Sequence, residues 1–178
     1  MRTAVVTGAS SGLGREFVKQ LSEEGKLDEI WVIARRREKL EELASSVKTP
    51  LRIFGASLDD EGLYGLLSVL MEREKPDIRL LINNAGRGTM TTLDEETTED
   101  AVSMIGLNCQ APVKMMNIET ACDESSYRSM PYFQFIPQRG KAGGIIPPAF
   151  PFAAFKSFYG TLGHAGKTGI VLLKSAAF

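Results

Sequence analysis

The chain of 178 residues has little cysteine, almost no net charge and no long apolar run. Its two cysteines, Cys109 and Cys122, are too few for a disulfide framework and favour apolar packing in a reducing compartment. A formal net charge of −1 excludes a broad electrostatic attraction to nucleic acid or to an anionic membrane surface. No apolar run approaches the length of a membrane span, and the opening MRTAVVTG is too short an apolar segment for a secretory signal. We therefore expect a soluble cytoplasmic protein without nucleic-acid, membrane or metal partners.

What the sequence does contain is a regular alternation of strand-like and helix-like segments. Short β-branched runs predict strands, and apolar residues at helical spacing predict helices between them. The strands are expected at residues 2–8, 28–34, 51–56 and 78–86, and the helices at 10–26, 36–47, 59–75 and 97–117, the last disturbed near Pro112. Short connections between alternating elements favour a parallel sheet covered by helices on both faces. The sequence thus predicts an α/β fold of the Rossmann type, a doubly wound parallel sheet in the order 3-2-1-4-5-6 within three α/β/α layers.

The pattern is weaker in the last third of the chain. Residues 132–136 and 169–173 are candidates for a fifth and a sixth strand, and residues 152–163 are a candidate helix. Residues 137–151 are rich in glycine and proline, which is typical of a loop. No repeat or linker marks a second domain, so we expect one domain over residues 1–178.

The strongest motif is TGASSGLGRE, residues 7–16, which falls between the first strand and the first helix. Its glycines let the chain leave the strand tightly, let the backbone approach a ligand, and permit close packing of helix on strand. The N–H groups at the helix start then face a pyrophosphate, and two serine hydroxyls add donors. A tight turn without a ligand is the alternative, but the strand before and the helix after favour a dinucleotide site. The cofactor-binding residues expected here are Gly8, Ser10, Ser11, Gly12, Leu13 and Gly14.

An arginine cluster follows the second strand. Dinucleotide sites that prefer NAD place an acidic residue near this point to hold the ribose 2′-hydroxyl, whereas this chain has Arg35, Arg36 and Arg37. Guanidinium groups suit a 2′-phosphate, so Arg35 and Arg36 predict NADP(H) rather than NAD(H) as the cofactor. The alternative is a solvated charge cluster at a helix start, and it accounts well for Arg37.

Three motifs in this order resemble those of the short-chain dehydrogenase/reductase family. They are TGASSGLG at 7–14, NNAG at 83–86 and the dipeptide Leu107–Asn108. The resemblance is clear over about residues 1–118 and weak beyond. It implies that Asn84, Ala85 and Gly86 lie against the cofactor at the end of the fourth strand. It also implies that Asn108 holds a water linking the active site to solvent.

The family's catalytic serine, tyrosine and lysine are only partly matched. Lys156, in FAAFKSF, takes the lysine position, which implies binding of the nicotinamide ribose and a lowered pKa for a neighbouring phenol. Phe152 stands at the tyrosine position and has no proton to give. The serine position falls near Gln138 and Arg139, neither of which is serine.

Other polar residues do not replace the missing phenol. Tyr159 would lie about 10 Å further along a helix than Phe152, too far for the same proton transfer. The single histidine, His164, is interpreted as a solvated loop residue. Ser57 stands where the family commonly has an aspartate near the adenine.

Three readings of the function follow. The first is an oxidoreductase that moves hydride between NADP(H) and a small-molecule carbonyl or alcohol substrate. The second is a dinucleotide-binding protein that has lost its proton donor, and the third is a truncated or frame-disrupted reductase. In each case we expect a single dinucleotide-binding domain, residues 1–178, lacking the usual C-terminal elements. Because family members commonly pair through the fourth and fifth helices, the resemblance also implies a homo-oligomer.

Overall fold

The computed structural model describes residues 1–88, 95, 97–120, 132–136 and 170–174. Six parallel strands form one sheet in the order β3-β2-β1-β4-β5-β6, which confirms the predicted topology. The strands are β1 (Arg2–Thr7), β2 (Glu29–Ile33), β3 (Leu51–Phe54), β4 (Asp77–Asn83), β5 (Tyr132–Ile136) and β6 (Ile170–Lys174). The strand order changes direction at β1, because β2 and β3 lie on one side of this strand and β4, β5 and β6 lie on the other. In such a sheet a ligand crevice is expected at the carboxyl ends of the two strands on either side of this change, β1 and β4.

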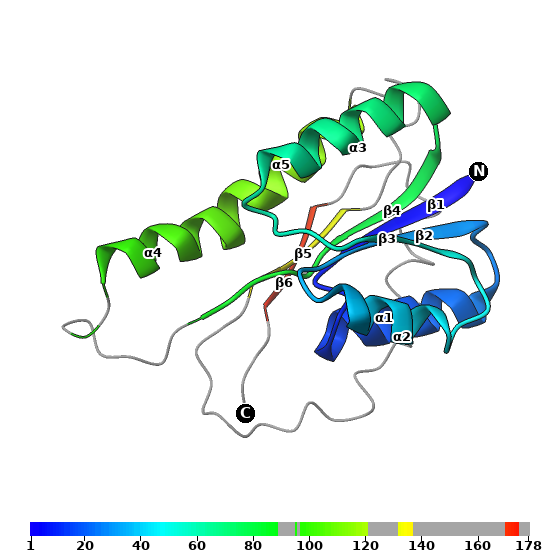
Figure 1. Cartoon of the computed structure of the whole chain (residues 1–178), viewed down its shortest axis with the longest axis horizontal. Coiled ribbons are helices and arrows are strands. Elements are labelled where there is room, and N and C mark those ends of the chain that lie inside the picture. The colour runs from blue at the N-terminus through cyan, green and yellow to red at the C-terminus, as the bar shows by residue number, and fades with distance from the viewer. Residues whose placement is uncertain (89–94, 96, 121–131, 137–169, 175–178) are drawn as a thin grey trace.

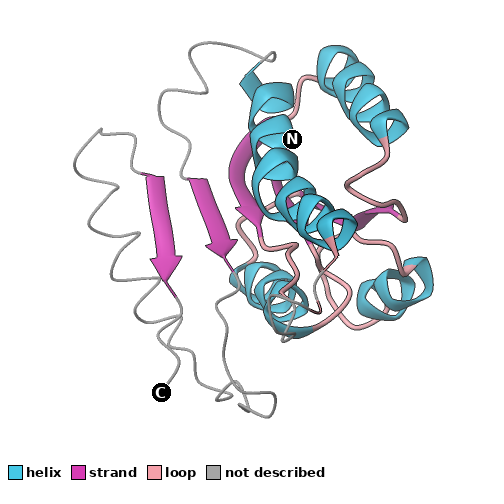
Figure 2. Cartoon of the chain, turned by 90° about the vertical axis from the view of Figure 1, so that its left-hand side faces the viewer, coloured by secondary structure: helices cyan, strands magenta, loops and turns pink. Residues whose placement is uncertain are grey.

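Helices cover both faces of this sheet (Figures 1 and 2). The layer on one face contains α1 (Gly12–Glu24) and α2 (Arg37–Ala44). The other layer contains α3 (Glu61–Glu74) and α5 (Ala111–Thr120), with α4 (Thr98–Ile105) continuing the line of α5 beyond the sheet. None of the helices in the described ranges is long and apolar enough to cross a membrane.

The core lies on both faces of the sheet, as the near-continuous apolar strands indicate. Along β1, Val5 faces α3 and α5 in a cluster with Trp31 and Leu81. Its neighbours Ala4 and Val6 face α1 and α2 in a second cluster. Alternation with a period of two therefore sends successive apolar residues to opposite cores, which a strand buried on both faces requires.

The disturbance expected near Pro112 is a π-helical turn. The predicted helix 97–117 is divided into α4 and α5 by the five-residue turn Gly106–Gln110. Proline has no N–H, and its ring collides with the carbonyl four residues earlier in a regular α-helix. Pro112 stands at the second residue of α5, so the wider turn falls just before it and carries Asn108.

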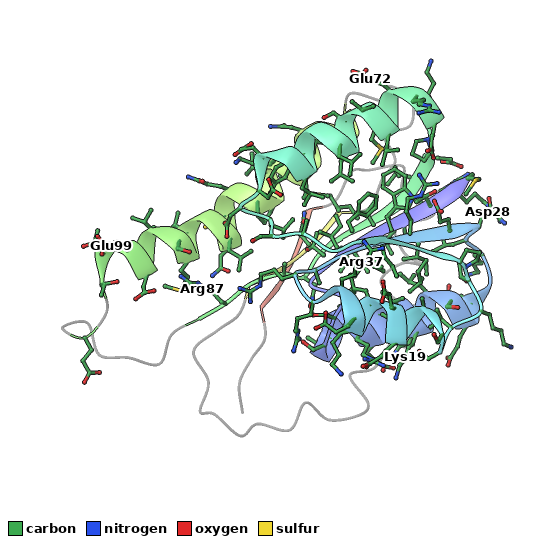
Figure 3. The ribbon with its side chains drawn as sticks, in the orientation of Figure 1. Lys19, Asp28, Arg37, Glu72, Arg87 and Glu99 are labelled. Carbon is green, nitrogen blue, oxygen red and sulfur yellow. The ribbon has the colours of Figure 1, made fainter. Side chains whose placement is uncertain are left out.

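Acid should weaken the ion pair between Arg2 and Asp28. This pair lies at the end of the sheet where β1 begins, and Figure 3 shows Asp28 there and Arg87 at the opposite end. The Arg2 guanidinium and backbone N–H both bond the Asp28 carboxylate at 2.7 Å, and these bonds lower the pKa of Asp28 to about 2. A folded-state pKa below the unfolded one adds stability above about pH 4 that is lost as pH falls toward 2. We expect Asp28→Asn to reduce the dependence of the melting temperature on pH in this window. The effect should be small and should shrink in high salt because the pair is exposed; an unchanged slope at low salt would contradict it.

Candidate functional site

A cavity of about 380 Å³ opens at the carboxyl ends of β1, β2, β3 and β4, where the reversal of the sheet places it. Its walls come from the segments after these strands, with Ser103 of α4 and Leu107 of the π-helical turn closing one side. Of the residues that the sequence assigns to a cofactor, the cavity is lined by Gly8, Ser10, Ser11, Leu13, Arg35, Arg36, Asn84, Ala85 and Gly86. Gly12, Gly14 and Asn108 are absent from its lining, and Lys156 lies outside the described residues.

The glycines of the turn between β1 and α1 have different functions in the structure. A Cβ at Gly14 would lie 2.4 Å from both Asn84 Nδ2 and the Gly8 carbonyl oxygen, so this position needs the absence of a side chain for packing. Gly12 has φ +56°, and a Cβ there would meet nothing within 4 Å. Gly14 therefore lets α1 approach the end of β4, whereas Gly12 supplies a left-handed turn with open space beside it.

A threonine hydroxyl joins the ends of β1 and β4. Thr7 is buried, and its Oγ1 accepts hydrogen bonds from the backbone N–H groups of Asn84 and Ala85, each at 3.0 Å. The side chain of Asn84 completes the junction by donating to the carbonyls of Thr7 and Gly8, each at 3.2 Å. These bonds fix the NNAG segment against the glycine turn. Sequence analysis missed Thr7, although a hydroxyl at the end of the run AVVT was the available signal.

Thr7→Val should destabilise the protein by about 1–3 kcal/mol while keeping the side-chain volume, because it removes the acceptor of the partly buried Ala85 N–H and leaves the Asn84 N–H with the Ile82 carbonyl at 3.1 Å. Thr3→Val in the same strand is the matched control, since the buried Thr3 hydroxyl bonds the nearby Met1 carbonyl at 3.2 Å, a contact within the same end of the chain. Urea unfolding measures both variants. Equal losses in the two would show that the Thr7 hydroxyl does not hold the junction.

The first turn of α1 is arranged to accept an anion. Its N-cap residue Ser11 has extended backbone (φ −163°, ψ 170°) and its side chain makes no capping bond, and the first turn contains no acidic residue. The helix has 13 residues, so its first N–H groups carry a partial positive charge toward the space beside the turn. Such a terminus suits phosphate oxygens.

The three arginines after β2 make different contacts. Arg36 reaches across to the glycine turn, where its Nη2 donates to the hydroxyls of Ser11 at 2.9 Å and Ser10 at 3.1 Å. Arg37 instead pairs with Glu41 one helical turn on, at 2.9 Å, and its side chain packs against Gly55. Arg35 is exposed and lines the cavity with Arg36. The contacts of Arg37 therefore fit the helix-start interpretation, whereas Arg35 and Arg36 line the cavity.

The side-chain amide of Asn108 fixes the segment that follows NNAG. Its Oδ1 accepts from the backbone N–H of Arg87 at 3.0 Å, and its Nδ2 donates to the Arg87 carbonyl at 2.7 Å. The Arg87 side chain in turn donates to the Asp100 carbonyl in α4 at 3.0 Å. The π-helical turn is thus tied to the edge of the cavity. The water-holding function that the resemblance implies for Asn108 stays a prediction.

A fourth wall follows β3 and consists of Ala56, Ser57, Leu58 and Asp59. The Ser57 hydroxyl donates to the Asp59 carboxylate at 3.3 Å, so a carboxylate does stand here, two residues after the position discussed above. Behind the wall, the buried Tyr64 donates its hydroxyl to the Leu58 carbonyl at 2.6 Å. Burial, with the charges of Glu61 and Asp59, raises the pKa of Tyr64 to about 12, so the phenol remains a donor at any working pH.

Lys156, the catalytic lysine that the resemblance implies, lies in an undescribed part of the chain, together with the other residues weighed for the missing phenol. Lys156, Phe152, Tyr159 and His164 fall within 137–169, as do the residues at the serine position. The described part of the site is therefore a cavity built from a glycine turn, two arginines and the end of β4, which the Asn84 side chain bonds to the glycine turn.

The sheet order and the glycine turn at its centre define a Rossmann-type α/β protein. The family model described as short chain dehydrogenase matches residues 2–123, and the chain belongs to this family of oxidoreductases. Solved structures agree in fold. A short-chain dehydrogenase from Sphingobium yanoikuyae in complex with NADPH has a TM-score of 0.67 at 20% identity, covering 97% of this chain and 70% of that one. An NADPH-bound carbonyl reductase from chicken fatty liver has a TM-score of 0.59 at 27% identity, covering 68% of this chain and 48% of that one.

Fungal reductases are among the relatives in sequence. A very-long-chain 3-oxoacyl-CoA reductase of Pyricularia oryzae is 30% identical over 156 residues, which is 83% of this chain and 44% of that protein. One of the same name from Candida albicans is 29% identical over 170 residues, 87% of this chain and 47% of that protein. The chain thus spans about half the length of these relatives.

Proposed function

We propose that this chain binds NADP(H) in the cavity and serves an oxidoreductase that moves hydride between this cofactor and a carbonyl or alcohol carbon. The observation that carries the proposal is the uncapped start of α1 beside Gly12, with the Arg36 guanidinium across the turn. The cavity then offers N–H donors at the start of α1, with positive charge beside them. A diphosphate bridge and a 2′-phosphate need these two features at neighbouring places.

The residues present fit the cofactor. The diphosphate would lie on the first turn of α1, where Gly12 leaves room for close approach. Arg35 and Arg36 would hold the 2′-phosphate, with Arg36 exchanging its two serine hydroxyls for phosphate oxygens. Asn84, Ala85 and Gly86, at the end of β4, would line the nicotinamide half. The NADPH bound by structural relatives supports the same choice of cofactor.

Bound NADPH supplies a hydride to an electrophilic carbon, and the chain must then position the substrate and provide a proton. Lys156 is the residue we assign to the nicotinamide ribose, and Asn108 is the one we assign to the proton path. Loss of a positioned general acid costs a rate factor of about 10²–10⁴. Phe152 thus predicts slow turnover by this chain even with the cofactor in place.

Phe152 also favours a second candidate, a protein that binds NADP(H) without reducing a substrate. The two candidates share the cofactor site and differ only in turnover. A homo-oligomer, paired through the helices around the π-helical turn as in related enzymes, is compatible with both. Exposed Val102, Ile105 and Val113 lie on these helices.

Calorimetric titration with NADPH and NADH tests the shared claim, and a carbonyl panel that includes a 3-oxoacyl thioester tests turnover. We expect NADPH to bind more tightly than NADH. Measurable oxidation of NADPH would support the oxidoreductase. Binding without oxidation would support the second candidate, provided that Phe152→Tyr restores oxidation. Binding of neither nucleotide by protein with an intact circular-dichroism spectrum would refute both.

A further inference from the structure

A buried tyrosine stands directly behind one wall of the cavity. Tyr64 belongs to α3 and is 7% exposed, and its hydroxyl donates to the carbonyl oxygen of Leu58 at 2.6 Å. Leu58 is one of four consecutive residues, Ala56 to Asp59, that line the cavity after β3. Tyr64 itself is not in the lining. The hydroxyl therefore bonds the backbone of the wall but does not itself face the cavity.

The tyrosine ring is held from its other side by α5. The Lys114 ammonium lies 5.1 Å from the ring centroid and pairs with Glu61 at the start of α3. Lys114 therefore links α5 to α3, and the two helices lie side by side on the same face of the sheet (Figure 1). A cation over an aromatic face restricts the ring's position. The phenol is thus anchored at both ends, and its hydroxyl meets the wall in a fixed direction.

The wall that Tyr64 supports belongs to the adenosine half of the cleft. It follows β3, and β3 pairs with β2, whose carboxyl end carries Arg35 and Arg36. If those arginines hold a 2′-phosphate, as the proposed function states, the wall after β3 lies beside the attached adenosine. The wall has other supports as well: Ser57 and Asp59 bond each other at 3.3 Å, the Asp60 N–H bonds the Ser57 carbonyl at 3.2 Å, and the Leu58 side chain is buried in the core.

We propose that Tyr64 is a positioning residue for cofactor binding, which pre-forms the adenosine wall, residues 56–59, through its bond to the Leu58 carbonyl. A wall fixed before binding spares the cofactor the cost of ordering it. Loss of one such bond should weaken affinity about three- to tenfold, because a single intramolecular hydrogen bond is worth about a factor of that size. The proposal depends on the proposed function for its ligand but concerns a residue outside the ligand's reach.

The test compares two variants that each remove one buried hydroxyl. Tyr64→Phe removes the bond to the wall and keeps the ring. Ser22→Ala is the matched control, since its hydroxyl accepts from the N–H groups of Lys48 and Thr49, at 3.0 and 2.9 Å, in a loop outside the cavity lining. Calorimetry gives the Kd of each protein for NADPH and for 2′,5′-ADP, which carries the adenosine half alone, and thermal melting gives stability.

We expect Tyr64→Phe to raise both Kd values about three- to tenfold, and Ser22→Ala to lower the melting temperature with both Kd values unchanged. A Tyr64→Phe protein that binds 2′,5′-ADP as wild type does would overturn the proposal. So would equal weakening by the two variants, since a merely structural effect would act alike in both. If the wild-type protein bound neither probe, the proposed function would fail together with this inference. If the wild type bound both probes and Tyr64→Phe bound them equally well, only this inference would fail.

Amide hydrogen exchange of wild-type protein gives a second measurement that needs no variant. The N–H of Asp60 bonds the Ser57 carbonyl at 3.2 Å in the ligand-free wall. A pre-formed wall should protect this amide before 2′,5′-ADP is added and change little afterwards. Protection that arises only on binding would show that the ligand, not Tyr64, orders the wall.

Discussion

Gly14→Ala should lower the free energy of unfolding by about 2–3 kcal/mol and abolish measurable NADPH binding. The added Cβ would lie 2.4 Å from the Gly8 carbonyl oxygen and 2.4 Å from Asn84 Nδ2. Neither atom can move freely, because the first is backbone and the second donates to the Thr7 and Gly8 carbonyls. Relief requires α1 to move away from β4, which displaces the N–H groups expected to bind the diphosphate. Urea unfolding and NADPH calorimetry measure the two effects.

Gly65→Ala provides the matched control for this substitution. Gly65 is exposed within α3, and a Cβ there would meet nothing within 4 Å. Alanine should therefore stabilise the protein by about 0.5–1 kcal/mol, because glycine loses more backbone entropy in a helix. The same chemical change thus has opposite expected signs at two helical positions. A Gly14→Ala protein as stable as wild type would show that α1 and β4 do not pack as closely as described.

The fold could be predicted from the sequence because its signals are local. Each strand up to β4 is a short run that contains apolar and β-branched residues, and the crossover rule then fixes parallel neighbours and their handedness. Element ends were less predictable: α2 was expected over 36–47 but ends at Ala44. Ser45 is its C-cap, and the Ser45 and Ser46 hydroxyls bond the carbonyls of Glu41 and Leu43, at 3.1 and 2.7 Å. Serine side chains that compete for backbone groups in this way end helices that apolar spacing alone would extend.

The site was predictable where one motif carries its own geometry and not where residues distant in sequence meet. The glycine turn could be read directly, because strand, glycines and helix are contiguous. Thr7 and Asn84 are 77 positions apart, and no local pattern pairs their hydrogen-bonding groups. The sequence places Tyr64 within a predicted helix and no more, since its bond to Leu58 depends on how the loop after β3 folds back. Hydrogen bonds between separate strand ends and loops require the three-dimensional structure.

The largest expected effect on binding alone is that of Arg36→Ala. We expect the Kd for NADPH to rise about 10–100-fold, because charge-assisted hydrogen bonds from a guanidinium to phosphate are worth about 1.5–3 kcal/mol. The Kd for NADH should stay within about twofold, since NADH has no 2′-phosphate for the guanidinium to bind. Stability should change little, because among the described residues the Arg36 side chain bonds only the hydroxyls of Ser10 and Ser11 at the cavity rim. Calorimetry at two salt concentrations measures the result, and added salt should weaken NADPH binding more in wild type than in the variant.

Arg37→Ala separates this effect from a general loss of positive charge. Arg37 is the next residue in the chain, and its replacement by alanine removes the same charge. Its side chain pairs with Glu41 at 2.9 Å, however, and does not line the cavity. Its replacement should leave the ratio of the NADPH and NADH affinities near the wild-type value. If Arg37→Ala lowered that ratio as much as Arg36→Ala, preference for NADP(H) would come from the overall positive field after β2. If only Arg36→Ala lowered it, the preference would lie in one guanidinium already placed against the glycine turn, where its bonds to the Ser10 and Ser11 hydroxyls fix its direction before any phosphate arrives.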